Sequence, residues 1–141
     1  MNYTQELQNK TIEHCKNILL TNFKINSNED KVLIIYDHGS SLSKLISIGF
    51  ENATKNLNVK SGMIKFNFEN HESILEEIKS NYSKGDTIIL IQTSSFRVSK
   101  YRWRKELCDI GYKVAEFAQL GKMLDNEVEP FIDALTTDFN H

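Results

Sequence analysis

The sequence predicts an α/β fold, in which three layers, α/β/α, surround a mostly parallel sheet of four strands. Short apolar runs rich in β-branched residues alternate along the chain with longer stretches whose apolar residues recur every three or four positions. Val32–Tyr36 and Thr87–Ile91 are the most continuously apolar runs, as is typical of strands buried on both faces. Strands that alternate with helices join through right-handed crossovers, so these two strands are expected to be adjacent, central and parallel.

The predicted elements follow from the apolar periodicity and from turn and cap residues. A serine, Ser40 or Ser41, caps the second helix, while Gly85 and Gly111 stop the third and fourth. In chain order, the helices are expected over residues 4–22, 41–57, 70–82, 99–109 and 129–135, and the strands over residues 32–36, 63–68, 87–91 and 113–118.

Length and composition predict one domain over residues 1–141, since 141 residues with 40% hydrophobic side chains can bury a core. The net charge of -2 gives no basic field that would attract nucleic acid or a membrane. No apolar run approaches the roughly 20 residues of a membrane span, and the polar first ten residues lack the apolar core of a signal peptide. A cytoplasmic protein without nucleic-acid or membrane partners is expected.

The chain has two cysteines, Cys15 and Cys108, too few to indicate a disulfide scaffold. Each falls on the expected buried face of a helix. Both are therefore predicted to be small buried hydrophobic residues rather than reactive thiols.

Polar side chains follow the two central strands. Asp37 and His38 come directly after the first strand, and Ser94, Ser95 and Arg97 follow the third. Ligands of open parallel sheets gather at the carboxyl ends of the strands, so these loops form a candidate site for a carboxylate, a phosphate or a metal-bound water. The alternative is structural, because aspartate and serine also form turns and helix caps.

No residue is assigned a catalytic role or a metal-binding role. No two of the four histidines are paired at helical spacing, and the chain has no HExxH or CxxC motif. It also lacks GxxxxGK[ST] and GxGxxG, which disfavours nucleotide binding of those types. No cofactor is therefore expected in this chain.

Five cationic side chains lie between Arg97 and Lys105, interleaved with Tyr101 and Trp103. Such a segment can bind single-stranded nucleic acid, but the chain as a whole is slightly acidic. Arginine and aromatic residues favour protein interfaces, so Tyr101, Trp103 and Arg104 are expected to contact another domain or subunit. A plain solvent-exposed helix remains the alternative.

The order of these segments resembles a known family. Residues 17–37 run from a helix end through a polar turn into an apolar strand that ends in Asp37. Thr87 then opens a strand followed by SerSerPheArg, Gly111, AlaGluPheAlaGlnLeu and LeuThrThrAspPheAsn. Over nearly its whole length the chain resembles the N-terminal domain of the thermophilic-type metal-dependent aminopeptidases, the aminopeptidase T and aminopeptidase S group. Arg97 falls about where relatives often have histidine.

The resemblance implies a supporting role in an aminopeptidase-like hydrolase. The family's Glu, His and Asp ligands belong to a second domain, so a divalent metal is expected there and not in this chain. This chain would form part of the active-site wall or of the dimer contact, with a C-terminal domain or a second copy as partner. Two alternatives stay open: a stand-alone α/β domain that binds an anionic small molecule at the strand ends, and a scaffold that associates through the helix near Trp103.

Overall fold

The central sheet has four parallel strands. The structure is a computed structural model that describes residues 3–37, 39–66, 71–92, 97–98, 101–117, 130 and 132, with the backbone alone for 71, 97–98 and 101–103. The strands are β1 (Lys31–Tyr36), β2 (Lys60–Lys65), β3 (Thr87–Ile91) and β6 (Lys113–Phe117), in the order β2-β1-β3-β6. Each neighbouring pair is parallel, and β1 and β3 are adjacent and central, which confirms the predicted fold class.

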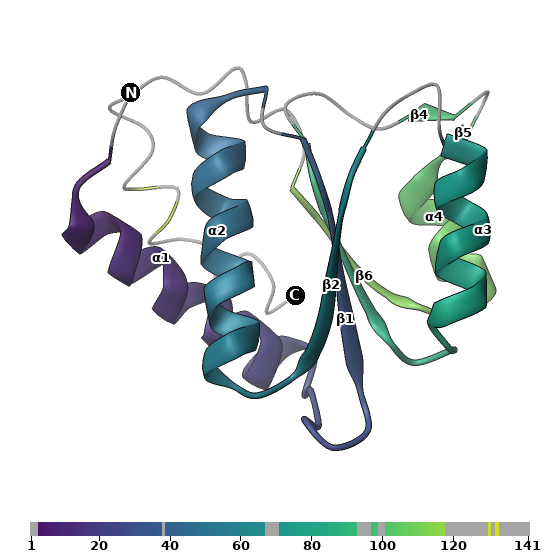
Figure 1. Ribbon diagram of the computed structural model, residues 1–141, viewed down its shortest axis with the longest axis horizontal. Coiled ribbons are helices and arrows are strands. Elements are labelled where there is room, and N and C mark those ends of the chain that lie inside the picture. The colour runs from purple at the N-terminus through teal and green to yellow at the C-terminus, as the bar shows by residue number, and fades with distance from the viewer. Residues whose placement is uncertain are drawn as a thin grey trace.

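Among the described elements, helices cover both faces of this sheet. Figure 1 shows α1 (Gln5–Asn17) and α2 (Ser41–Asn56) on one face, and α3 (His71–Asn81) and α4 (Trp103–Ile110) on the other. All of β3 is buried, as are the four central residues of β1, because apolar side chains cover both faces of these strands. The core accordingly divides into two clusters, one around Ile18 and Phe50 and one around Ile78 and Leu107.

The first helix changes its winding before it ends. Thr4 caps α1 by accepting the N–H of Leu7 at 3.1 Å. The helix continues as a π-helical turn, η1 (Ile18–Asn22), so the expected extent is confirmed while the winding of the last five residues differs. Lys24 then takes a positive φ of 51°, and the chain enters β1 after a short turn.

The second helix begins where the sequence places its cap. Ser40 Oγ accepts the N–H of Ser43 at 3.1 Å, and Ser43 Oγ accepts the N–H of Ser40 at 3.2 Å. This reciprocal capping box fixes the start of α2 one residue after Ser40. Farther along, Gly49 faces Thr11 and Cys15 of α1, where the missing side chain lets the two helices pack closely.

Strand β2 covers Lys60–Lys65, three residues earlier than the predicted 63–68. It is an edge strand whose residues are exposed or half-buried, so no continuous apolar run marks its bounds. Gly62 in this strand lies against the side chain of Tyr82, so a Cβ atom at position 62 would stand 2.5 Å from the phenol oxygen. A larger residue at this position would displace the Tyr82 hydroxyl.

The segment predicted as one helix over residues 99–109 contains strand as well. β4 (Arg97–Val98) pairs antiparallel with β5 (Tyr101–Arg102), and α4 starts only at Trp103. The helical prediction was therefore wrong for Tyr101 and Arg102. Valine and tyrosine favour extended backbone, and the pairing of Tyr101 with Val98 holds this part of the segment as a strand.

The two cysteines differ in their surroundings. Cys15 is fully buried, and this burial raises the pKa of its thiol. Cys108 is exposed, so the prediction that it is buried was wrong. In α4 the fully buried side chain is the preceding Leu107, and one residue turns the helix by about 100°, which carries Cys108 out of the core.

The amino edge of the sheet is held by the buried side chain of Asp86. Its Oδ1 accepts the N–H of Lys31 at 3.0 Å, and its Oδ2 accepts the N–H of Ser83 at 2.7 Å. Its backbone carbonyl accepts the N–H of Lys113 at 3.0 Å. One residue thus connects the starts of β1, β3 and β6.

Tyr112 lies beside this edge and is almost fully buried. Its hydroxyl donates to the carbonyl of Tyr82 at 2.9 Å. Burial first, and the carboxylate of Asp86 second, raise the pKa of Tyr112 above its ordinary value. The pKa of Tyr82 is raised by burial and then by the carboxylates of Glu77 and Asp86.

Of the predicted last helix, residues 130 and 132 are described, and both are helical. Ile132 is fully buried in the same core cluster as Cys15, Ile18 and Phe50. The chain therefore comes back to the sheet face that α1 and α2 cover. The other residues of that predicted helix lie outside the described part.

Candidate functional site

The strand order places a topological switch point between β1 and β3. The connection that leaves β1 runs through α2 on one face to β2, whereas the connection that leaves β3 runs through α4 on the other face to β6. The two connections diverge at the carboxyl edge, and ligands of open parallel sheets bind where the connections diverge in this way. Figure 1 shows this edge at the top of the molecule, together with the β4–β5 ribbon.

Asp37 stands at this edge, as the sequence predicts. Its N–H donates to the carbonyl of Ile91 at 3.1 Å, which extends the β1–β3 ladder by one residue. Gln92 follows on the other side, where its N–H donates to the carbonyl of Phe117 at 2.8 Å and its side chain is buried. The loops that follow β1 and β3, which form the predicted site, therefore leave neighbouring strands at one edge of the sheet.

The carboxylate of Asp37 also shapes its own loop. Its Oδ1 accepts the N–H of Gly39 at 3.1 Å, a turn in which the side chain closes on the backbone two residues later. This turn is the structural role that was the alternative to a ligand-binding role for Asp37. The bond occupies one oxygen of the carboxylate and directs the chain into the cap of α2.

The other predicted site residues are placed only in part. His38, Ser94 and Ser95 lie outside the described residues. The backbone of Arg97 lies in β4, in register with Arg102 of β5. Of the predicted interface residues, Tyr101 and Trp103 have described backbones, and the side chain of Arg104 is exposed.

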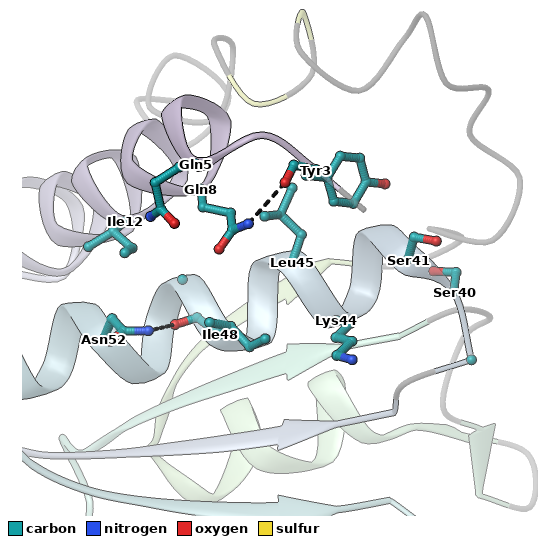
Figure 2. Close-up of a pocket in the computed structure, with 12 residues that line it drawn as sticks. Tyr3, Gln5, Gln8, Ile12, Ser40, Ser41, Lys44, Leu45, Ile48 and Asn52 are labelled. Atoms are coloured by element: carbon teal, nitrogen blue, oxygen red, sulfur yellow. Dashed lines mark hydrogen bonds between the residues drawn. The ribbon is translucent and has the colours of Figure 1, made fainter. Parts of the chain in front are cut away.

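A groove of about 760 Å³ runs between α1 and α2 and opens beside the same loop. Gly39, Ser40 and Ser41 form its end at the sheet edge, so the groove and the strand-end loop share residues. Figure 2 shows the walls of the groove, with Gln5, Gln8 and Ile12 on α1 facing Leu45, Ile48 and Asn52 on α2.

The walls of the groove mix polar and apolar side chains. Lys44 is the one charged side chain among its described lining residues, and it lies at the end of the first turn of α2. Leu45 and Ile48 follow, facing Ile12 of α1. The amide nitrogen of Gln8 donates to the carbonyl of Tyr3 at 3.0 Å, which ties the segment before α1 to the first turns of that helix. Side-chain amides of Gln5 and Asn52 also line the groove, so neither wall is purely apolar.

The sequence did not predict the groove. Lys44 and Ile48 were missed because the helical pattern assigns α2 one apolar face, toward the core. A signal was present, since Ile48 is apolar but lies off that face, and its side chain is 39% exposed. Isolated apolar residues of this kind are common on protein surfaces, so Ile48 did not stand out as a site residue.

Two further findings apply to the described part of the chain alone. No three histidine, cysteine, aspartate or glutamate side chains come close enough there to hold a metal ion. Among the same residues, no helix combines the length and the apolar character that crossing a bilayer demands.

The comparisons with known proteins give no assignment for this arrangement. No family model, no curated protein and no solved structure matches the chain.

Proposed function

We propose that this chain is a binding domain for a small anionic molecule, held at the carboxyl edge between β1 and β3. The observation that carries the proposal is the strand order β2-β1-β3-β6, whose connections diverge where Asp37 and Gln92 follow their strands. A molecule that carries a carboxylate or phosphate group is the ligand class that this edge favours.

The start of α2 supports a negative ligand group. The 16-residue helix α2 directs the positive end of its dipole toward this edge. Lys44 adds a full positive charge at the end of the first turn. Because the carboxylate of Asp37 accepts the N–H of Gly39 within this loop, the anion is expected beside Ser41 and Lys44, away from that carboxylate.

The β4–β5 ribbon supplies more positive charge at this end of the molecule. Arg97 and Arg102 are register partners on its two strands, and the ribbon lies at the end of the molecule where β1 and β3 end. An arginine contact with an anion contributes roughly 1.5–3 kcal/mol, or about tenfold or more in affinity. Arg97 is therefore the residue whose removal tests the site most directly.

The experiment is a titration of the isotope-labelled chain with inorganic phosphate and with acetate, followed by amide chemical shifts. The amides of Gly39–Ser43 and Gln92 are expected to shift, and Arg97→Ala should weaken binding about tenfold. Lys79→Ala is the matched control, since Lys79 is exposed on α3, away from this edge. No shift in either loop at millimolar ligand would refute the proposal.

A second candidate function is that of an accessory domain in an aminopeptidase-like metalloprotein. The resemblance over residues 17–37 supports it, and there a helix end, a turn and a strand do follow one another as η1, residues 24–30 and β1. Reading the gene beyond the codon for His141 tests this candidate. An adjoining coding region for a domain with Glu, His and Asp ligands would favour it, and a stop codon there would exclude that arrangement.

Activity measurements test both candidates at once. The isolated chain is expected to release no chromophore from aminoacyl anilides, with or without zinc or cobalt, because the family's ligand set belongs to a second domain. Release that persists through repeated purification and is lost in His38→Ala would contradict both the accessory role and the simple binding role.

A further inference from the structure

We propose that β2, the edge strand of the sheet, binds an extended peptide that carries acidic residues and pairs with β2 as an additional strand. The peptide would lie along Lys60–Lys65, on the side of β2 that faces away from β1. This edge is separate from the anion site at the ends of β1 and β3, so the inference goes beyond the proposed function and does not rest on it.

One side of β2 presents backbone groups that no described strand occupies. Within the described part of the chain, β2 pairs with β1 alone and is the first strand of the order β2-β1-β3-β6. Phe66 continues that pairing by donating its N–H to the carbonyl of Tyr36 at 2.8 Å. Successive residues of a strand direct their backbone groups to opposite sides, so Ser61, Met63 and Lys65 direct theirs away from β1. An extended peptide can pair with this row of N–H and C=O groups.

The strand is held in position by contacts with the layers on both of its faces. The hydroxyl of Thr54 in α2 donates to Ser61 Oγ at 3.2 Å. Gly62 lies against the phenol oxygen of Tyr82, which directly follows α3. Figure 1 shows α2 on one side of β2 and α3 on the other. Because the strand is already ordered, pairing costs it little conformational freedom, and more of the pairing energy remains as affinity.

An added strand would cover apolar side chains on both faces of β2. Met63 packs against the core cluster that contains Ile18 and Phe50, and Ile64 packs against the cluster that contains Ile78. Both side chains are only half-buried. The side chains of a neighbouring strand would lie beside them and remove apolar surface from water. Apolar residues are therefore expected in the middle of the peptide.

Charge decides which partner fits this edge. Lys60 and Lys65 begin and end the strand, both are exposed, and the strand contains no acidic residue. Neither lysine forms an ion pair with a described residue. The β2 strand of a second copy would bring two more lysines to the same edge, so like charges disfavour self-pairing. Acidic residues near both ends of a peptide would instead lie beside these lysines, whichever way the peptide runs.

Amide chemical shifts of the isotope-labelled full chain, titrated with the peptide acetyl-EVTVVE-amide, test the inference. The two glutamates of this peptide are five positions apart, as Lys60 and Lys65 are. The control peptide acetyl-KVTVVK-amide keeps the apolar middle and reverses the charges. It should bind about tenfold more weakly at low salt, because two exposed attractions become repulsions, and the difference should shrink as the salt concentration rises.

The pattern of shifts along β2 identifies backbone pairing. The amides of Ser61, Met63 and Lys65 should shift more than those of Gly62 and Ile64, because only the first three are directed toward the peptide. A peptide held by the lysine side chains alone would not produce this alternation. Equal shifts along the strand, or no shift at millimolar peptide, would overturn the inference.

Exchanging the charges of the strand tests the choice of partner. Lys60→Glu combined with Lys65→Glu should reverse the preference, so that the lysine peptide binds more tightly than the glutamate peptide. The matched control is Lys84→Glu combined with Lys105→Glu, which changes the net charge equally. Lys84 lies against Gly111 and Lys105 belongs to α4, so both are on the β6 side of the sheet. This control should keep the preference of the parent.

A neutral variant keeps the test valid if the charge exchange impairs folding. Lys60→Gln combined with Lys65→Gln should bind both peptides with similar affinity. A preference for the glutamate peptide that survives in this variant would contradict the role of the two lysines. Shifts in β2 that grow with protein concentration in the absence of peptide would identify a second copy as the occupant and would also overturn the inference.

Discussion

The contact between α1 and α2 at Gly49 gives a quantitative test of how the two helices pack. A Cβ atom at this position would lie 2.9 Å from the methyl carbon of Thr11 and 3.1 Å from the sulfur of Cys15. Thr11 is fully buried, and its hydroxyl donates to the carbonyl of Leu7 at 2.7 Å, which fixes the side-chain rotamer. The Thr11 side chain therefore cannot rotate its methyl group away from a Cβ atom at position 49 without losing this hydrogen bond.

Two opposing effects decide the outcome of Gly49→Ala. Alanine is favoured over glycine inside a helix by about 0.8–1 kcal/mol. Overpacking a closely packed contact costs about 1–3 kcal/mol, and here relief requires either a shift of the helices or the loss of the Thr11 hydrogen bond. With an overpacking cost in the middle of that range, about 2 kcal/mol, steric repulsion is the larger effect, and the free energy of unfolding is expected to fall by about 1 kcal/mol.

A double-mutant cycle isolates the cause. Thr11→Ser removes the methyl group and keeps the hydroxyl that donates to Leu7, so Gly49→Ala should cost about 1 kcal/mol less in that background. Urea unfolding of the four proteins, followed by far-ultraviolet circular dichroism, measures each free energy. If Gly49→Ala is as stable as the parent, or costs the same in both backgrounds, the steric argument is wrong.

Three further predictions address the amino edge and the cysteines. Asp86→Asn replaces one of two carboxylate oxygens that accept backbone N–H groups, so urea unfolding should show a loss of about 1.5–3 kcal/mol, and an unchanged midpoint would contradict this role. A thiol reagent should label Cys108 rapidly and Cys15 only as the chain unfolds, because burial raises the pKa of the Cys15 thiol. The variant Cys108→Ser should lose the rapid phase of labelling, and a rapid phase that persists in it would refute the assignment. Because the folded state raises the pKa of Tyr112, its stabilising contribution is complete below the unfolded pKa of about 10 and is lost as the pH rises beyond it. Unfolding free energies measured on both sides of that pH should therefore decline less for Tyr112→Phe than for the parent, and equal declines would count against it.

The sequence by itself determined the elements that hydrophobic burial specifies. Val32–Tyr36 and Thr87–Ile91 are the most continuously apolar runs because both faces of these strands are covered. Such runs can be identified from the sequence alone. The position of Asp37 after β1 followed from the same reasoning, since the end of an apolar run marks the edge of the sheet. A cap at Ser40 or Ser41 was predictable because a capping hydroxyl bonds to a residue only three positions away, and the structure places the cap at Ser40.

The tertiary structure alone decided the features that depend on partners distant in the chain. The bounds of β2 follow from pairing with β1 and from Tyr82 lying over Gly62, twenty residues away. The groove exists because α1 packs on α2 at Gly49, so its lining combines residues 3–12 with residues 39–52. Cys108 lies in solvent because contacts with the sheet turn Leu107 inward. The periodicity of apolar residues shows which side of one helix or strand avoids water. These features depend on which other element packs against that side, and only the tertiary structure shows this.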